Sequence, residues 1–100
     1  MPALLVINYD VTDTERLDTY RASAVAGLVE LGEGTVLAVT DSTVDLGEGN
    51  GAGATTVILG FSSAESAQRA FASDEYQAVV GERIAATNPS FAIIVPMIDG

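Results

Sequence analysis

A chain of 100 residues has the size of one domain and is long enough to bury a single hydrophobic core, so we predict one domain over residues 1–100. Cysteine, histidine and lysine are absent, which excludes disulfides, thiol nucleophiles, lysine Schiff bases and the usual haem and zinc ligands. We therefore expect no cofactor and no bound metal. The formal net charge of −10 would repel a nucleic acid.

Apolar residues make up 48% of the chain but occur in short blocks, none close to the ~18 consecutive residues of a membrane-spanning helix. The first seven residues lack the positive charges and the cleavage site of a secretory signal. We expect a cytoplasmic protein that contacts neither membrane nor nucleic acid, with its acidic residues forming a solubilising surface.

The N-terminal part of the chain predicts a strand and a long helix. Residues 3–10 form an apolar, β-branched block after Pro2, which is typical of a strand. Thr12 and Glu15 have the spacing of a capping box and predict a helix start. Apolar side chains then recur at helical spacing, at Leu17, Tyr20, Ala24, Leu28 and Leu31. We expect Gly32 to end this helix in the left-handed conformation.

Two further strands are predicted at residues 35–41 (TVLAVTD) and 55–61 (TTVILGF). The stretch between them is rich in turn-forming residues and has four glycines within residues 47–53. This composition indicates a long, mobile hairpin connection, not a phosphate-binding loop, because no lysine follows it and it leads into a strand.

The C-terminal part predicts two helices and a last strand. Ser62 with Glu65, and then Ser73, mark the two helix starts. Residues 91–97 form the last strand, which Pro96 places at a sheet edge because proline cannot donate a hydrogen bond to a neighbouring strand. The order strand, helix, two strands, helix, strand predicts an α+β, ferredoxin-like βαββαβ domain with a four-stranded antiparallel sheet.

Both faces of this sheet are predicted to be apolar. In the first strand, one face presents Leu5, Ile7 and Tyr9, and the other Leu4, Val6 and Asn8. The third and last strands alternate between two apolar sets in the same way. The helices can cover one face only, and the other would be a larger apolar patch than soluble monomers tolerate. We therefore expect a homodimer formed through the sheet face.

Residues 61–88 (FSSAESAQRAFASDEYQAVVGERIAATN) resemble an uncharacterised bacterial family, domain of unknown function 1330. In that family a phenylalanine and a capped alanine-rich helix precede an S-x-E-Y-Q segment and an arginine-containing turn. Residues 5–24 are similar to the family's first strand and helix. The most specific part is residues 74–77 (DEYQ) followed by Arg83.

The resemblance implies the dimeric α/β-barrel superfamily, whose ferredoxin-like subunits associate through their sheets. That superfamily includes cofactor-independent monooxygenases, haem-dependent enzymes, isomerases and ligand-binding domains of transcription factors, so membership does not identify a reaction. This chain departs from its relatives at residues 47–53, which lack the bulky and basic residues expected before the third strand.

Arg83 is the first candidate for a binding site, because it lies in a short and otherwise apolar segment after the predicted third helix. A guanidinium beside a cavity binds a carboxylate or an enolate through two hydrogen bonds. The alternative is a structural role, either in an ion pair with Glu82 or Asp74 or as a cap on carbonyl groups at a helix end.

Three further residues are candidate ligands of the same pocket. Tyr20 and Tyr76 each lie on the inward face of a predicted helix, where a phenol hydrogen-bonds either a ligand or a core partner. Asn8 is a polar residue in an apolar strand and is either paired with backbone or exposed to a cavity.

Three functions remain open at this stage. The first is a small-molecule-binding dimer with an anionic or phenolic ligand in a pocket between sheet and helices, bound by Asn8, Tyr20, Tyr76 and Arg83. The second is a cofactor-independent monooxygenase or isomerase of the dimeric α/β-barrel type. The third is a structural or interaction module without catalysis.

Overall fold

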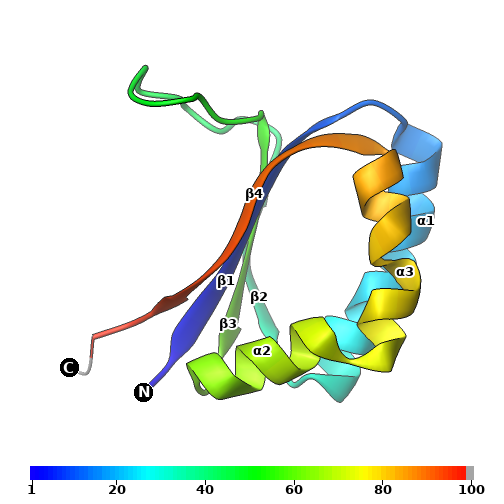
Figure 1. Ribbon diagram of the computed structural model, residues 1–100, viewed down its shortest axis with the longest axis vertical. Helices are drawn as coiled ribbons and strands as arrows, with labels where there is room; N and C mark the ends of the chain where they lie inside the picture. Colours follow the sequence, from blue (N-terminus) through cyan, green and yellow to red (C-terminus); the bar gives the residue numbers. More distant parts are fainter. Residues whose placement is uncertain (99–100) are drawn as a thin grey trace.

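The computed structural model describes residues 1–98, which form one four-stranded sheet covered by helices (Figure 1). In chain order the elements are β1 (Ala3–Val11), α1 (Thr14–Ala24), the π-helix η1 (Val25–Leu31), β2 (Thr35–Thr40), β3 (Thr55–Phe61), α2 (Ala64–Ala72), α3 (Asp74–Ala85) and β4 (Thr87–Pro96). The strand order is β2-β3-β1-β4, and every neighbouring pair is antiparallel. The predicted ferredoxin-like α+β fold is therefore confirmed.

All helices lie on one side of the sheet, and the core forms between them and the facing side chains of β1 and β3 (Figure 1). Leu5, Ile7, Tyr9 and Leu59 are buried there. Among residues 1–98, no helix is long and apolar enough to cross a membrane.

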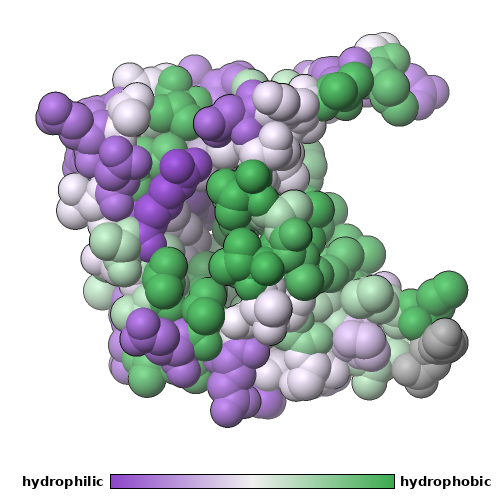
Figure 2. Space-filling view, turned by 180° about the vertical axis from the view of Figure 1, so that it is seen from behind, coloured by the Kyte–Doolittle hydropathy of each residue, from purple (hydrophilic) through white to green (hydrophobic). Residues whose placement is uncertain are grey.

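The other face of the sheet is left uncovered and is apolar, as its alternation predicts. It presents Val6 and Ile58 in the middle strands, and Phe91, Ile93 and Val95 remain 38–46% exposed on β4. Figure 2 shows apolar side chains gathered along the sheet side of the molecule, below a projecting loop. One apolar face of the sheet is thus buried under the helices, and the other apolar face is exposed to solvent.

Two helix starts differ by one residue from the prediction. Asp13, not Thr12, caps α1 and accepts a hydrogen bond from the backbone N–H of Arg16 at 3.1 Å. The backbone N–H groups of Thr12 and Asp13 both donate to the carbonyl of Ala86, so the start of α1 is tied to the end of α3. Ser63, not Ser62, caps α2. The predicted cap at Ser73 is confirmed.

The long first helix changes type partway and does not end as predicted. After Ala24 the helix continues as the π-helix η1. Gly32 has a φ of −82° and is not left-handed, whereas Glu33 has a φ of 62°. Gly32 is required for space, because a Cβ there would lie 2.6 Å from the side chain of Ala70. Gly27 similarly lets η1 approach the backbone of Tyr76, 3.2 Å from where a Cβ would stand.

The last strand begins earlier than predicted. β4 starts at Thr87 instead of residue 91 and pairs with β1 along its whole length, with an irregularity between Asn8 and Tyr9. The irregularity leaves Ser90 without a partner residue in β1, and the predicted edge position of the strand is confirmed.

Residues 41–54, which we call the arm, connect β2 to β3 and extend away from the helices (Figure 1). The carboxylate of Asp45 accepts hydrogen bonds from the backbone N–H groups of Gly47 at 2.7 Å and Ala52 at 2.9 Å. At the base of the arm, Gly53 lies so close to the Tyr9 backbone that a Cβ would overlap the Tyr9 carbonyl. The predicted hairpin connection is therefore internally hydrogen-bonded.

We expect Gly53→Ala to lower the free energy of unfolding by about 1–3 kcal/mol, because the added methyl group overlaps the backbone of Tyr9. Urea denaturation followed by circular dichroism measures this change. Gly81→Ala is the control, because its Cβ would enter open space on α3, and helix propensity predicts a gain of up to ~1 kcal/mol. Equal stabilities of Gly53→Ala and the wild type would contradict the close contact.

Candidate functional site

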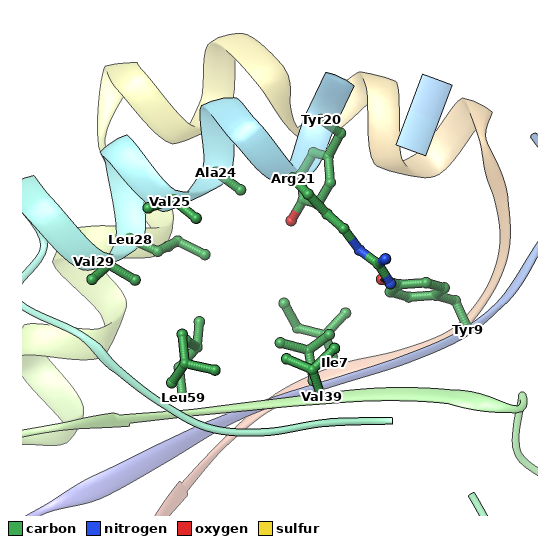
Figure 3. Close-up of a pocket in the computed structure, with 12 residues that line it drawn as sticks. Ile7, Tyr9, Tyr20, Arg21, Ala24, Val25, Leu28, Val29, Val39 and Leu59 are labelled. Atoms are coloured by element: carbon green, nitrogen blue, oxygen red, sulfur yellow. Dashed lines mark hydrogen bonds between the residues drawn. The ribbon is translucent and has the colours of Figure 1, made fainter. Parts of the chain in front are cut away.

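A cavity of about 190 Å³ lies between the helix pair α1 and η1 and the part of the sheet formed by β1, β3 and β2 (Figure 3). Most of its wall is aliphatic, from Ile7, Ala24, Val25, Leu28, Val29, Val36, Val39, Val57 and Leu59. Its polar lining residues are Tyr9, Tyr20 and Arg21. The cavity therefore combines an apolar body with a few phenol and guanidinium groups.

Arg21 lies beside Tyr9 at one side of the cavity. It reaches from α1 toward β1, and its Nη2 donates a hydrogen bond to the hydroxyl of Tyr9 at 3.4 Å (Figure 3). Arg21 also lines a second hollow of about 360 Å³, together with Asp10, Asp18 and Asp41. No three acidic side chains of residues 1–98 come close enough together to hold a metal ion. Arg21 thus forms part of the wall between an apolar cavity and an acidic hollow.

Tyr20 and Tyr76 form a buried hydroxyl pair next to this cavity. Their hydroxyl oxygens are 2.7 Å apart, and their rings meet edge to face with centroids 6.2 Å apart. Burial raises the pKa of the Tyr20 phenol well above its ordinary value, and the charge and hydrogen bond of Tyr76 add to the rise, while Arg83 opposes it. Tyr20 therefore stays protonated at neutral pH and acts as a neutral hydrogen-bonding group.

Arg83 is a buried cation near the same pair. Only 4% of its surface is exposed, and within residues 1–98 its Nε has no hydrogen-bond partner. The alternative ion pair with Glu82 does not form, because Glu82 pairs with Arg16 instead. A buried guanidinium without a carboxylate partner is costly, since it loses hydration without a compensating charge.

Three of the four predicted site residues come together, and the fourth does not. Tyr20 from α1 meets Tyr76 from α3, and the charge of Arg83 is close enough to affect the pKa of Tyr20. Tyr20 alone among them lines the cavity itself.

Asn8 points to the opposite face of the sheet. Its amide donates to the carbonyls of Gly53 and Thr55 and to the hydroxyl of Thr56, and its oxygen accepts from the N–H of Gly53 at 2.6 Å. These bonds fasten the arm to β1, so Asn8 has a structural role and does not line the cavity.

Tyr9 and Arg21 both line the cavity but were not among the predicted site residues. Tyr9 was detectable as a core residue, because it shares the strand face of Leu5 and Ile7. Arg21 stands four residues after Leu17 and three before Ala24, so helical spacing places it on the inward stripe.

We expect Tyr20→Phe and Tyr76→Phe each to lower the free energy of unfolding by about 1–2 kcal/mol, because each leaves a buried hydroxyl without its partner. The double variant should lose less than the sum, with a coupling of about 1 kcal/mol in urea denaturation. Tyr9→Phe with Tyr76→Phe is the control pair and should be additive. Additivity of the Tyr20 and Tyr76 substitutions would show that their hydrogen bond contributes nothing.

Comparison with known proteins identifies the family and supports the fold. No curated protein matches the chain. A crystal structure of a protein of unknown function from Rhodopseudomonas palustris aligns with a TM-score of 0.77 and 15% identity, covering 99% of this chain and 84% of the other. A NIPSNAP family protein from Agrobacterium tumefaciens aligns with a TM-score of 0.64 and 15% identity, covering 99% and 95%. The family model Domain of unknown function (DUF1330) matches residues 2–97, so the chain belongs to this family.

Proposed function

We propose that the protein binds a small molecule whose apolar part fills the cavity and whose anionic or phenolic oxygen is held by Arg21 and Tyr9. The observation that carries this proposal is an aliphatic cavity with a guanidinium and a phenol hydroxyl in its wall. Apolar walls with a few convergent polar groups are typical of small-molecule sites. An anion or a phenol accepts or donates the hydrogen bonds that these groups offer.

The size of the cavity limits the ligand. A volume of about 190 Å³ is slightly larger than an engineered apolar cavity of ~150 Å³ that binds benzene. A single aromatic ring with a carboxylate or hydroxyl group is therefore the fitting class.

The charges near the cavity favour an anionic group. In residues 1–98 neither Arg21 nor Arg83 has a carboxylate partner, since the one ion pair there joins Arg16 to Glu82. A guanidinium in the wall of an apolar cavity attracts a bound anion at close range, where little water screens the two charges. The phenol of Tyr20, whose pKa burial raises, serves this site as a neutral hydrogen-bonding group.

We expect benzoate to bind the wild-type protein in isothermal titration calorimetry, and Arg21→Met to weaken it at least 10-fold, because the carboxylate loses its charged partner. Ala24→Leu should abolish binding by filling the cavity. Arg16→Met is the control, because Arg16 is exposed and pairs with Glu82 on the surface. Binding of benzoate unchanged by both Arg21→Met and Ala24→Leu would contradict the proposed site.

Arg83→Met separates the binding role of that residue from a structural one. If Arg83 supplies charge to the site, the variant keeps its stability or gains some, because a buried unpaired charge is removed, and benzoate binding weakens. A loss of stability with no effect on benzoate would assign Arg83 to the structure alone.

We also propose that the protein is a homodimer that covers the open sheet face with a second copy. The exposed Phe91, Ile93 and Val95 continue the apolar surface of Val6 and Ile58. Burying several hundred Å² of this surface contributes on the order of 10 kcal/mol before the cost of association.

The dimer should appear in sedimentation velocity at micromolar concentration. Ile93→Glu places a charge on the open face and should give a folded monomer, because the charge would be buried without a partner in the dimer. Ile84→Glu, on the exposed side of α3, is the control and should remain dimeric. A wild-type protein that sediments as a monomer would contradict the proposed dimer.

A further inference from the structure

The arm holds two aliphatic side chains in solvent. Val44 is 79% and Leu46 is 84% exposed, and they flank Asp45 in the arm. No buried cluster of residues 1–98 includes either side chain. Two large aliphatic side chains on a projecting loop are unfavourable in water unless another surface covers them.

The backbone of the arm is braced, so these side chains are presented in a defined position. Asp45 ties together the two sides of the arm through Gly47 and Ala52. Gly47, Gly49 and Gly51 have φ values of 82°, 72° and 83°, which glycine adopts at little cost and other residues rarely adopt.

The base of the arm is fixed to the sheet as well. The backbone N–H of Thr43 donates to the carbonyl of Ala54 at 3.0 Å, and the hydroxyls of Thr43 and Thr56 are 2.6 Å apart. Asp10 accepts a hydrogen bond from the N–H of Ala54 at 2.9 Å. The arm therefore starts from a base that is hydrogen-bonded to β1 and β3.

The arm projects on the side of the molecule that the helices leave open. In Figure 1 the helices lie to the right of the sheet and the arm extends to the left from one end of the strands. Figure 2 shows the same projection from behind, with apolar surface below it. A partner molecule that packs on the open face would therefore lie next to the arm.

The area of the open face suits a second copy of the chain as its cover, and the arm lies beside that face. Strands of six to ten residues at ~3.3 Å per residue, four abreast at ~4.8 Å, give the sheet a flat footprint on the order of 500 Å². A standard stable interface buries about 800 Å² of accessible surface on each partner, which is of the same order as a side-chain-covered face with this flat footprint. The arm extends the apolar surface beyond the sheet on the same side and supplies further area.

We propose that the arm is a dimer clasp: in the homodimer proposed above, Val44 and Leu46 of each copy pack against the other copy. This inference rests on the proposed dimer and assigns a role to residues 41–54 within it. A twofold interface uses both arms, so every substitution in the arm acts twice.

Sedimentation equilibrium of a Val44→Ser/Leu46→Ser variant tests the clasp. We expect the dissociation constant of the dimer to rise at least 10-fold, because four apolar side chains per dimer are replaced. The free energy of unfolding of the monomer, measured by urea denaturation, should change little. Leu31→Ser/Ile84→Ser is the matched control, because these residues are also 63% and 52% exposed but lie on the helices. The control should change the dissociation constant less than twofold.

A fluorescent label gives an independent measurement. The chain has no cysteine, so Leu46→Cys accepts a single environment-sensitive dye. Its emission should shift to the blue at the concentration where the protein dimerises, and a dye at Leu31→Cys should not shift. A dye at position 46 that prevents dimerisation also supports the clasp, provided that the dye at position 31 does not.

Two outcomes separate the clasp from the dimer itself. A wild-type dimer in which the dye at position 46 never shifts, with a serine variant of unchanged affinity, would overturn the clasp and leave the dimer standing. A wild-type protein that stays monomeric would overturn both.

Discussion

The whole molecule depends on covering one face of a four-stranded apolar sheet with a single layer of helices. Crossover connections between parallel strands are right-handed, and in the order β2-β3-β1-β4 this rule places both connections on the same side. The topology, and not a difference in hydrophobicity, therefore decides which face the chain buries. The buried face provides the core and the cavity, and the other face is left open with the arm beside it.

The cavity results from the way the first helix is held. α1 packs against α3, and Gly27 and the Tyr20–Tyr76 contact draw the helix pair toward α3. Several of the side chains that line the cavity from this helix are small, namely Ala24, Val25 and Val29, and together with Leu28 they leave space unfilled. A π-helical segment is often found at functional sites, and here η1 turns Val25, Leu28 and Val29 toward the cavity.

The fold could be read from the sequence because its evidence is local: strand alternation, helical spacing and capping residues identify each element. The site could be read only in part. Tyr20 and Tyr76 stand on apolar stripes, so their inward position follows from periodicity. Arg83 was predicted to follow the third helix, but it lies within α3, which continues to Ala85. The hydrogen bond between Tyr9 and Arg21 joins two elements and depends on how α1 lies over β1, which no spacing records.

The partner of Asn8 could not be predicted from the sequence. A polar residue in an apolar strand signals a partner, but the partner was the backbone of a loop 45 residues further along the chain. The cap of α1 shows a related limit, because the backbone N–H groups of both Thr12 and Asp13 donate to the carbonyl of Ala86, a tertiary contact that the local sequence does not reveal.

The paired hydroxyls of Tyr20 and Tyr76 have a consequence for what the cavity can recognise. Each phenol carries one hydrogen, and the contact between the two oxygens uses only one of them. When Tyr76 donates, the hydrogen of Tyr20 is free for an acceptor in the cavity; when Tyr20 donates, only its lone pair is left to offer. Rotation of the two hydroxyl hydrogens therefore switches Tyr20 between donor and acceptor. The same arrangement of heavy atoms can then bind a ligand that accepts a hydrogen bond or one that donates it.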